Sequence, residues 1–240
     1  MKLRQAVTGL AVAAALGSGS CAWGGTFVSN PLVLDFDTDA LGNPILHGQV
    51  IDDEYAAWGV TIDVDHPSNS DLDFGLALNT AVSIEADMRT SQANGAFHPS
   101  NTEFLGNVLI APRNNIDANN DEILDLPDTA FEKPNAEFTF SFADAVYFGG
   151  AVTILDAEEA GGYIRTYFED SVVGEVLIPA LGDNSVVTLD LPQARYDKIV
   201  VLLAGSGGLN DVTAGVDDVP EPTTAALLGL GGLAMLRRRR

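Results

Sequence analysis

The sequence predicts an all-β protein, an antiparallel β-sandwich with a jelly-roll-like arrangement. Short apolar runs separated by Gly, Asn, Asp and Pro recur through the chain, as in sandwiches built from many short strands. Residues 137–142, EFTFSF, alternate strictly between apolar and polar, which places Phe138, Phe140 and Phe142 on one face of a strand. No long segment between residues 23 and 219 has apolar residues at helical spacing.

Each expected strand follows from a local apolar run. We expect about ten strands, enough for two packed sheets, with the closing strand just before the C-terminal tail. In chain order the candidate segments are 32–36, 50–57 (a strand or one helical turn), 58–64, 74–78, 81–84, 107–111, 137–142, 145–155, 162–168, 172–178, 185–191, 198–203 and 211–216. Residues 37–44 and 65–70 are expected turns, and 85–103 is a polar, irregular excursion.

The first 22 residues have the pattern of a secretory signal peptide. Lys2 and Arg4 are followed by the apolar run 6–16 and then by small residues. Ser20-Cys21-Ala22 fits a cleavage site before Trp23, while a lipoprotein signal that acylates Cys21 is the alternative. Cys21 is the single cysteine, so the chain has no internal disulfide, and ordinary cleavage leaves no thiol for catalysis or metal binding.

The last 22 residues have three parts in a fixed order. A proline-flanked break comes first, then an uncharged apolar segment, 223–236, which predicts a short helix, and then a basic stop. As a helix the segment reaches roughly 21 Å, short of a bilayer's hydrocarbon core of roughly 30 Å. The break and the stop consist of Pro220, Glu221, Pro222, Arg237, Arg238, Arg239 and Arg240.

This tail closely resembles the PEP-CTERM sorting signal of exported bacterial proteins, over Val219 to Arg240. The resemblance implies recognition by a membrane-embedded exosortase, transient anchoring by the apolar helix, cleavage near the Pro-Glu-Pro break, and delivery to the cell surface or extracellular matrix. Phrases such as YAAWGVTIDV from Tyr55 and GSGGLNDV from Gly205 resemble the cargo of such proteins, which implies a secreted β-sandwich. The expected organisation is signal peptide 1–22, sandwich domain 23–218 and sorting signal 219–240.

The segment between the two signals is strongly acidic. It retains six basic and 33 acidic residues, a formal net charge of −27, more extreme than the −22 of the whole chain. Such a surface repels phosphates, so the composition excludes nucleic acid as a partner. It attracts cations, and the self-repulsion keeps the segment soluble.

One loop has the ligand order of a twelve-residue calcium site. In 117–128, DANNDEILDLPD, oxygen ligands fall at positions 1, 3, 5, 7 (a backbone carbonyl), 9 and 12. They are Asp117, Asn119, Asp121, Ile123, Asp125 and Asp128. Two features depart from the pattern: Glu122 stands where a sharp turn prefers glycine, and Asp128 replaces a bidentate glutamate. The alternative is a solvated turn rich in Asp and Asn.

Two weaker candidate sites remain open. Asp35, Asp37 and Asp211 lie on the first and last expected strands, so a cation there would join the chain's terminal strands, whereas exposed strand carboxylates are the alternative. Tyr55 and Trp58 would form a platform for stacking on a sugar, or else pack in the core. Tyr163 and Tyr167 share a strand face, and we expect them in the core.

Catalytic patterns are absent from the sequence. His47, His66 and His98 have no metal-ligand spacing, and Gly205-Ser206-Gly207 does not fit a nucleophile elbow. We therefore expect a non-enzymatic, calcium-stabilised structural or adhesive protein of the surface or matrix, with the secretion machinery and an exosortase as partners and extracellular polysaccharide as a further one. A secreted carbohydrate-binding module is the alternative, followed by a glycoside hydrolase.

Overall fold

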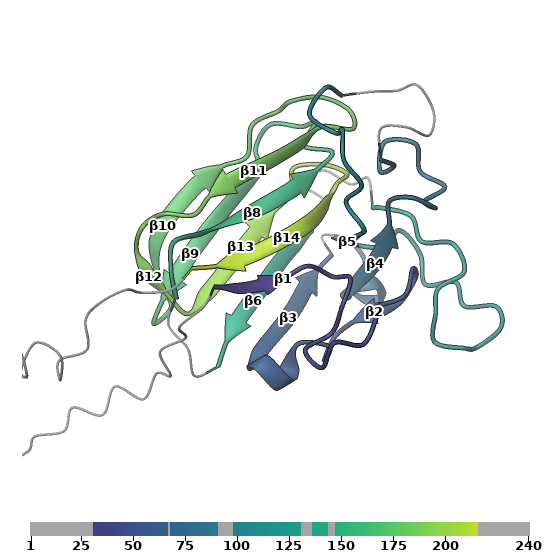
Figure 1. The fold of residues 1–240 in the computed structure, drawn as a ribbon, viewed down its shortest axis with the longest axis horizontal. Helices are drawn as coiled ribbons and strands as arrows, with labels where there is room; N and C mark the ends of the chain where they lie inside the picture. Colours follow the sequence, from purple (N-terminus) through teal and green to yellow (C-terminus); the bar gives the residue numbers. More distant parts are fainter. Residues whose placement is uncertain (1–30, 67, 91–97, 131–135, 144–146, 216–240) are drawn as a thin grey trace, which may run out of the picture.

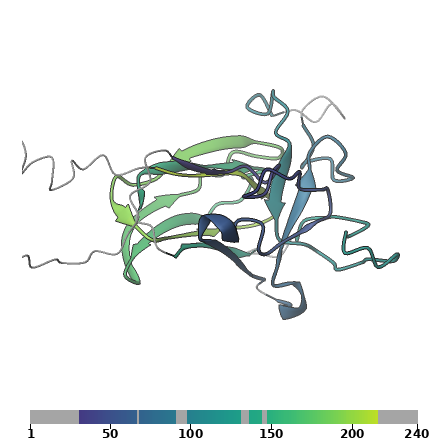
Figure 2. The same cartoon turned by 60° about the horizontal axis from the view of Figure 1, so that its bottom comes forward.

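Two antiparallel sheets form the body of the protein (Figure 1). The computed structural model describes residues 31–66, 68–90, 98–130, 136–143 and 147–215. The predicted signal peptide, Cys21 and the predicted sorting signal lie outside these residues. Within them, the prediction of an all-β antiparallel sandwich is confirmed, and Figure 2 shows the two sheets as two layers.

The larger sheet has seven strands. Its order is β11-β8-β14-β5-β4-β2, and β1 pairs with β14. The expected meeting of the first and last strands is confirmed, because Leu32 faces Ala214 and Leu34 faces Val212. The bounds are β1 Leu32–Leu34, β2 Val50–Ile51, β4 Gly75–Asn79, β5 Asn107–Ile110, β8 Gly150–Leu155, β11 Val186–Asp190 and β14 Gly208–Ala214.

The smaller sheet has five strands in the order β10-β9-β13-β6-β3. Their bounds are β3 Val60–Asp65, β6 Glu137–Phe142, β9 Tyr163–Phe168, β10 Ser171–Leu177 and β13 Lys198–Leu202. Two short strands, β7 Tyr147–Phe148 and β12 Arg195–Tyr196, pair with each other. Single 3-10 turns occur at Ala56–Trp58 and Ser70–Leu72.

The main core lies between the sheets. Phe138, Phe140 and Phe142 of β6 are buried, as the alternation predicts. They belong to one cluster with residues of the larger sheet such as Val152 and Leu209. The alternating pattern along β6 therefore aims every second side chain at the opposite sheet, and the intervening polar side chains face outward.

A second cluster lies on the other face of the larger sheet, at β4 and β5. Loop residues cover this face, so β4 and β5 are buried on both sides and read as continuous apolar runs. The cluster consists of Leu76, Leu78, Met88, Val108, Ile110, Leu124 and Leu155. Leu124 belongs to the 113–128 loop, so this cluster fastens the candidate calcium loop to the sandwich.

Two expectations for individual segments need correction. Residues 145–155 do not form one strand, because Gly149 and Gly150 have positive φ angles of 67° and 115° and separate β7 from β8. Residues 81–84 form a turn in which two backbone N–H groups donate to the carbonyl of Asn79. For residues 50–57, expected to be a strand or one helical turn, the structure has both: β2 at the start and the first residues of the 3-10 turn Ala56–Trp58 at the end. The short strand β12 was not predicted.

Candidate functional site

An acidic pocket of about 610 Å³ lies between the chain around β2 and the 113–128 loop. Six carboxylate residues line it, together with the amides Gln49 and Asn115 and four apolar residues. The lining contains no lysine, arginine or histidine. The carboxylates are Asp52, Asp53, Glu54, Asp117, Asp121 and Glu122. Two segments about 65 residues apart in sequence thus bring their negative charges to one cavity, which favours a cation.

Backbone pairing holds the two segments together. Gln49 forms an isolated antiparallel bridge with Ile123, and the Leu124 N–H donates to the Gly48 carbonyl at 2.8 Å. Gly48 has a φ of 87°, and a Cβ there would lie 2.4 Å from the Leu124 carbonyl oxygen. Glycine is therefore required at position 48 both for its conformation and for the close approach of the loop.

The loop organises its own carboxylates. The backbone N–H groups of Asn120 and Glu122 donate to the Asp117 carboxylate at 2.7 and 3.0 Å. The Asn119 side chain donates to Asp121 at 3.0 Å, and the Ile123 N–H donates to the same Asp121 at 3.1 Å. The first half of the predicted ligand set is thus gathered on a tight turn, with Asp117, Asp121 and Ile123 lining the pocket.

The second half of the predicted set has other partners. Asp125 accepts the Ala118 N–H at 2.7 Å, and Asp128 accepts from the Arg113 guanidinium at 3.2 Å. Asp128 is held there because its carbonyl accepts the Arg113 N–H, which ties position twelve to the chain beside β5. Glu122 adopts the left-handed conformation, with a φ of 69°, at the position where the sequence lacks the usual glycine.

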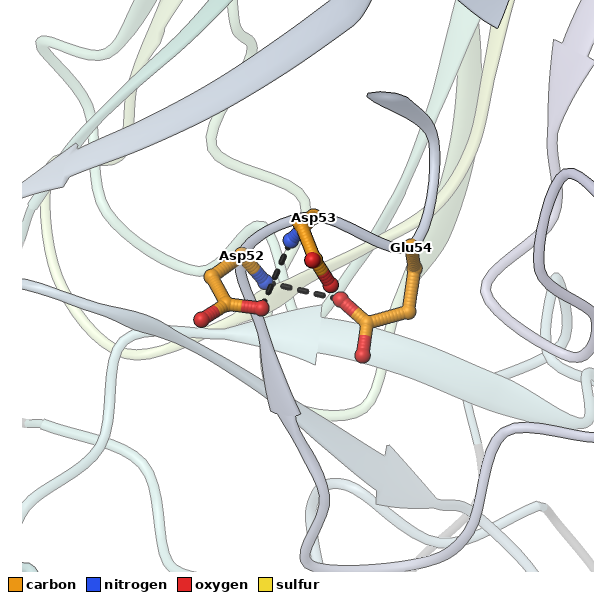
Figure 3. A group of neighbouring side chains, drawn as sticks. All are labelled: Asp52, Asp53 and Glu54. Atoms are coloured by element: carbon orange, nitrogen blue, oxygen red, sulfur yellow. Dashed lines mark hydrogen bonds between the residues drawn. The ribbon is translucent and has the colours of Figure 1, made fainter. Parts of the chain in front are cut away.

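The facing turn carries three consecutive acidic residues (Figure 3). One carboxylate oxygen from each of Asp52, Asp53 and Glu54 lies within 4.8 Å of the others. The Asp52 N–H donates to Glu54 and the Asp53 N–H to Asp52, at 2.8 and 2.6 Å. Glu54 also accepts from the Gln49 side chain at 2.8 Å. The sequence did not predict this turn as part of a site, and the run of three acidic residues, DDE, is its only signal there.

The second predicted site is partly assembled by the pairing of β1 with β14. Burial raises the pKa of Asp37, and the nearby charges of Asp35 and Asp211 raise it further. Each of the three carboxylates nevertheless has a protein donor: Asp35 accepts the Thr38 N–H, Asp37 the Asn107 N–H, and Asp211 the Asn210 side chain. The three residues lie close enough to interact electrostatically, as the predicted strand pairing requires.

A further carboxylate group lies away from the pocket and was not expected. Carboxylate oxygens of Asp156, Glu158 and Asp183 lie within 4.8 Å of one another. Asp156 is fully buried and accepts the Asn184 N–H at 2.7 Å and the Ser206 hydroxyl at 3.0 Å. Burial raises the pKa of Asp156 to about 7, and the charges of Asp87 and Glu158 act in the same direction.

The aromatic residues divide between core and surface. Tyr55 is 1% exposed and its hydroxyl accepts the Phe36 N–H, so it is a core residue and not part of a sugar platform. Trp58 is 42% exposed, with its ring centroid 5.6 Å from that of Tyr55. The expectation that Tyr163 and Tyr167 pack in the core is wrong: both are partly exposed, on the opposite face of β9 from the buried Ile164.

A comparison with known protein families identifies the C-terminal tail. The model of the PEP-CTERM protein-sorting motif matches residues 218–240. The chain carries this sorting motif. PEP-CTERM tails mark exported proteins that an exosortase sorts, so the predicted export and sorting are confirmed, while the motif itself lies outside the described residues. In the described part of the chain no helix is both long and apolar enough to span a bilayer.

Comparisons of the whole chain with curated sequences and solved structures add little to the description of the sandwich domain. No curated protein sequence matches it. A Streptococcus pneumoniae fucose binding module superposes with a TM-score of 0.28 and 14% identity, over 36% of this chain and 67% of the module. Discoidin II from Dictyostelium discoideum superposes with a TM-score of 0.30 and 14% identity, over 44% of this chain and 48% of the discoidin. Both likenesses are too partial to bear on what the sandwich binds.

Proposed function

We propose that this PEP-CTERM protein is a non-enzymatic structural or adhesive component of the cell surface or extracellular matrix, stabilised by calcium at the acidic pocket. The apolar tail segment holds the chain in the membrane until an exosortase cleaves near Pro220–Pro222. The observation that supports the calcium site is the pocket lining, in which six carboxylates meet and no basic side chain contributes. Calcium prefers six to eight hard oxygen ligands, and carboxylates supply them.

The geometry indicates how the ion would be held. Asp117 and Asp121 are oriented by backbone N–H donors of their own loop, so each can offer its remaining lone pairs to an ion. Asp52, Asp53 and Glu54 face them from the other segment. The ion would therefore bridge two segments that already meet at the backbone bridge between Gln49 and Ile123, and would strengthen the docking of the loop.

Calcium is expected to raise the melting temperature of the processed, exported protein. At calcium concentrations 10 to 100 times the dissociation constant, binding to the folded state adds about 1.4–2.7 kcal/mol, or about 3–10 °C for a domain of this size. Calorimetric titration and melting in calcium against chelator measure the effect. The double variant Asp117→Ala, Asp121→Ala is expected to lose it.

The control variant removes the same number of carboxylates, two, from a strand outside the pocket. Asp63→Ala, Asp65→Ala removes two exposed carboxylates from β3, which does not line the pocket, and it is expected to keep the calcium response. A flat titration and an unchanged melting temperature at about 10 mM calcium, roughly ten times the weakest dissociation constants of extracellular calcium modules, would reduce the loop to a solvated turn. The protein would then be a sorted acidic sandwich that needs no metal.

Carbohydrate binding is the second candidate, and the exposed ring of Trp58 is the observation that favours it. Truncating an aromatic residue at the centre of a binding site typically lowers the affinity by about tenfold or more. If the candidate is right, Trp58→Ala weakens retention of the protein on extracellular polysaccharide by about tenfold in affinity electrophoresis. Phe104→Ala, at an aromatic residue that is 65% exposed, is the matched control. Equal retention of the two variants would remove Trp58 from any sugar site.

A further inference from the structure

Strand β10 is an open edge of the five-stranded sheet. Among the described strands it pairs with β9 alone, and Figure 1 places it at the end of the molecule opposite to β2. It is seven residues long, and three of its apolar side chains are exposed: Val172 at 54%, Val173 at 38% and Leu177 at 71%. A long, apolar edge strand offers unpaired backbone groups and apolar side chains to another strand.

The charge on β10 sets it apart from the rest of this acidic molecule. Its single ionisable side chain, Glu175, accepts from the Arg165 guanidinium of β9 at 2.6 Å. The edge is therefore locally neutral, although the segment between the two signals has a net charge of −27. The opposite edge of the same sheet, β3, exposes Asp63 and Asp65, and outward-pointing charges on an edge strand hinder pairing. A second copy of the chain therefore meets less repulsion at β10 than at β3.

The geometry of β10 limits how such a copy fits. A register shift between Val172 and Gly174 leaves the last four residues, 174–177, in regular pairing with β9. If Val176 lies opposite its own copy in an antiparallel pair, Leu177 faces Glu175 of that copy and the two Glu175 residues do not face each other. This register avoids a like-charge pair directly opposite, which is destabilising in antiparallel sheets.

We propose that β10 pairs with β10 of a second copy of this chain, joining the two five-stranded sheets into one continuous sheet across a two-fold axis. The same surface serves both partners, so the assembly closes as a dimer. Salt screens the repulsion between the acidic bodies, so the dimer forms more readily at high ionic strength. The contact involves no residue of the acidic pocket, and its test is therefore run in chelator, where the calcium proposal has no influence.

Sedimentation velocity of the processed protein, over a range of concentrations and at 0.01 and 0.5 M salt (roughly the extremes of screening), tests the proposal. We expect a concentration-dependent dimer that is favoured at 0.5 M salt. Leu177→Lys is expected to weaken dimerisation at least tenfold, because residue 177 lies within the paired segment and a charge there must be desolvated in the dimer. Thr61→Lys places the same charge on β3 and is expected to leave the dimer intact.

Melting curves of each variant establish that it is folded; Leu177 is so exposed that its replacement leaves the core untouched. A protein that stays monomeric at every concentration and salt level overturns the proposal. So does a dimer that Leu177→Lys leaves unchanged, or one that Thr61→Lys weakens as much as Leu177→Lys does. Loss of the dimer in Leu177→Lys, with the dimer retained in Thr61→Lys, supports pairing through this edge.

Discussion

Replacing Phe140 by alanine is expected to lower the free energy of unfolding by about 3–5 kcal/mol, the usual cost of removing a buried phenylalanine ring. Phe140 is fully buried in the middle of β6, opposite Ile62 of β3 on one side and Ile199 of β13 on the other. The truncation leaves a cavity between the sheets that these neighbours cannot fill, because their own backbones are fixed by pairing with β6.

Urea unfolding followed by fluorescence measures the change. Ser141→Ala is the matched control, since it is the next residue on the same strand and lies on the outward face; it is expected to change stability by no more than about 0.5 kcal/mol. If Phe140→Ala cost less than about 1 kcal/mol, the ring would not occupy the centre of the core.

The second large effect is a loss of stability as the pH rises from about 4 to 7. The pKa of Asp156 is raised from its usual 3.8 to about 7, and burial likewise raises that of Glu85 to about 7. In this interval the folded chain keeps protons that the unfolded chain has released, so increasing pH favours unfolding. A tenfold change in proton affinity corresponds to about 1.4 kcal/mol, so the two groups together lower stability by roughly several kcal/mol between these limits.

Asp156→Asn is expected to flatten this dependence by about half. The asparagine oxygen can still accept the Asn184 N–H, and the Ser206 hydroxyl can reverse its role and accept from the new amide. Unfolding in chelator at pH 4.5, 6 and 8, roughly spanning the titration, compares the variant with the natural chain. Glu85→Gln should remove a similar share, because the pKa of Glu85 is raised to a similar value, and the new amide oxygen can still accept the Thr129 N–H. Parallel curves for the natural chain and Asp156→Asn would contradict the assignment.

Much of the fold was predictable because the strands of the second half carry local signals. The alternation in EFTFSF fixed both the bounds of β6 and the inward direction of its three phenylalanines. The failures have equally local causes. Gly149 and Gly150 interrupt an apolar run that otherwise predicts one strand, and a turn that exposes Val82 and Ile84 has the composition of a strand. Apolar composition alone predicts neither the break between β7 and β8 nor the turn at residues 81–84.

The candidate site was predictable only in part. The order of oxygen ligands from Asp117 to Asp121 is a local pattern, and the structure gathers those residues on one turn. The contribution of Asp52–Glu54 depends on the pairing of Gln49 with Ile123, which lies 74 positions away. No periodic pattern in the sequence predicts such a long-range contact. The ion pair of Asp128 with Arg113 likewise depends on the backbone bonds beside β5.

The pairing of β14 with β1, β5 and β8 means that the larger sheet is complete only when the last of its strands is present. Residues 208–214 occupy the middle of the larger sheet, so a chain that crosses a membrane from its amino end carries an incomplete sheet until these residues have emerged. The sorting motif begins at residue 218, immediately afterwards. The strand that completes the larger sheet and the sorting motif are therefore separated only by residues 215–217, so a chain that crosses amino end first can complete its sandwich only when the motif is about to follow.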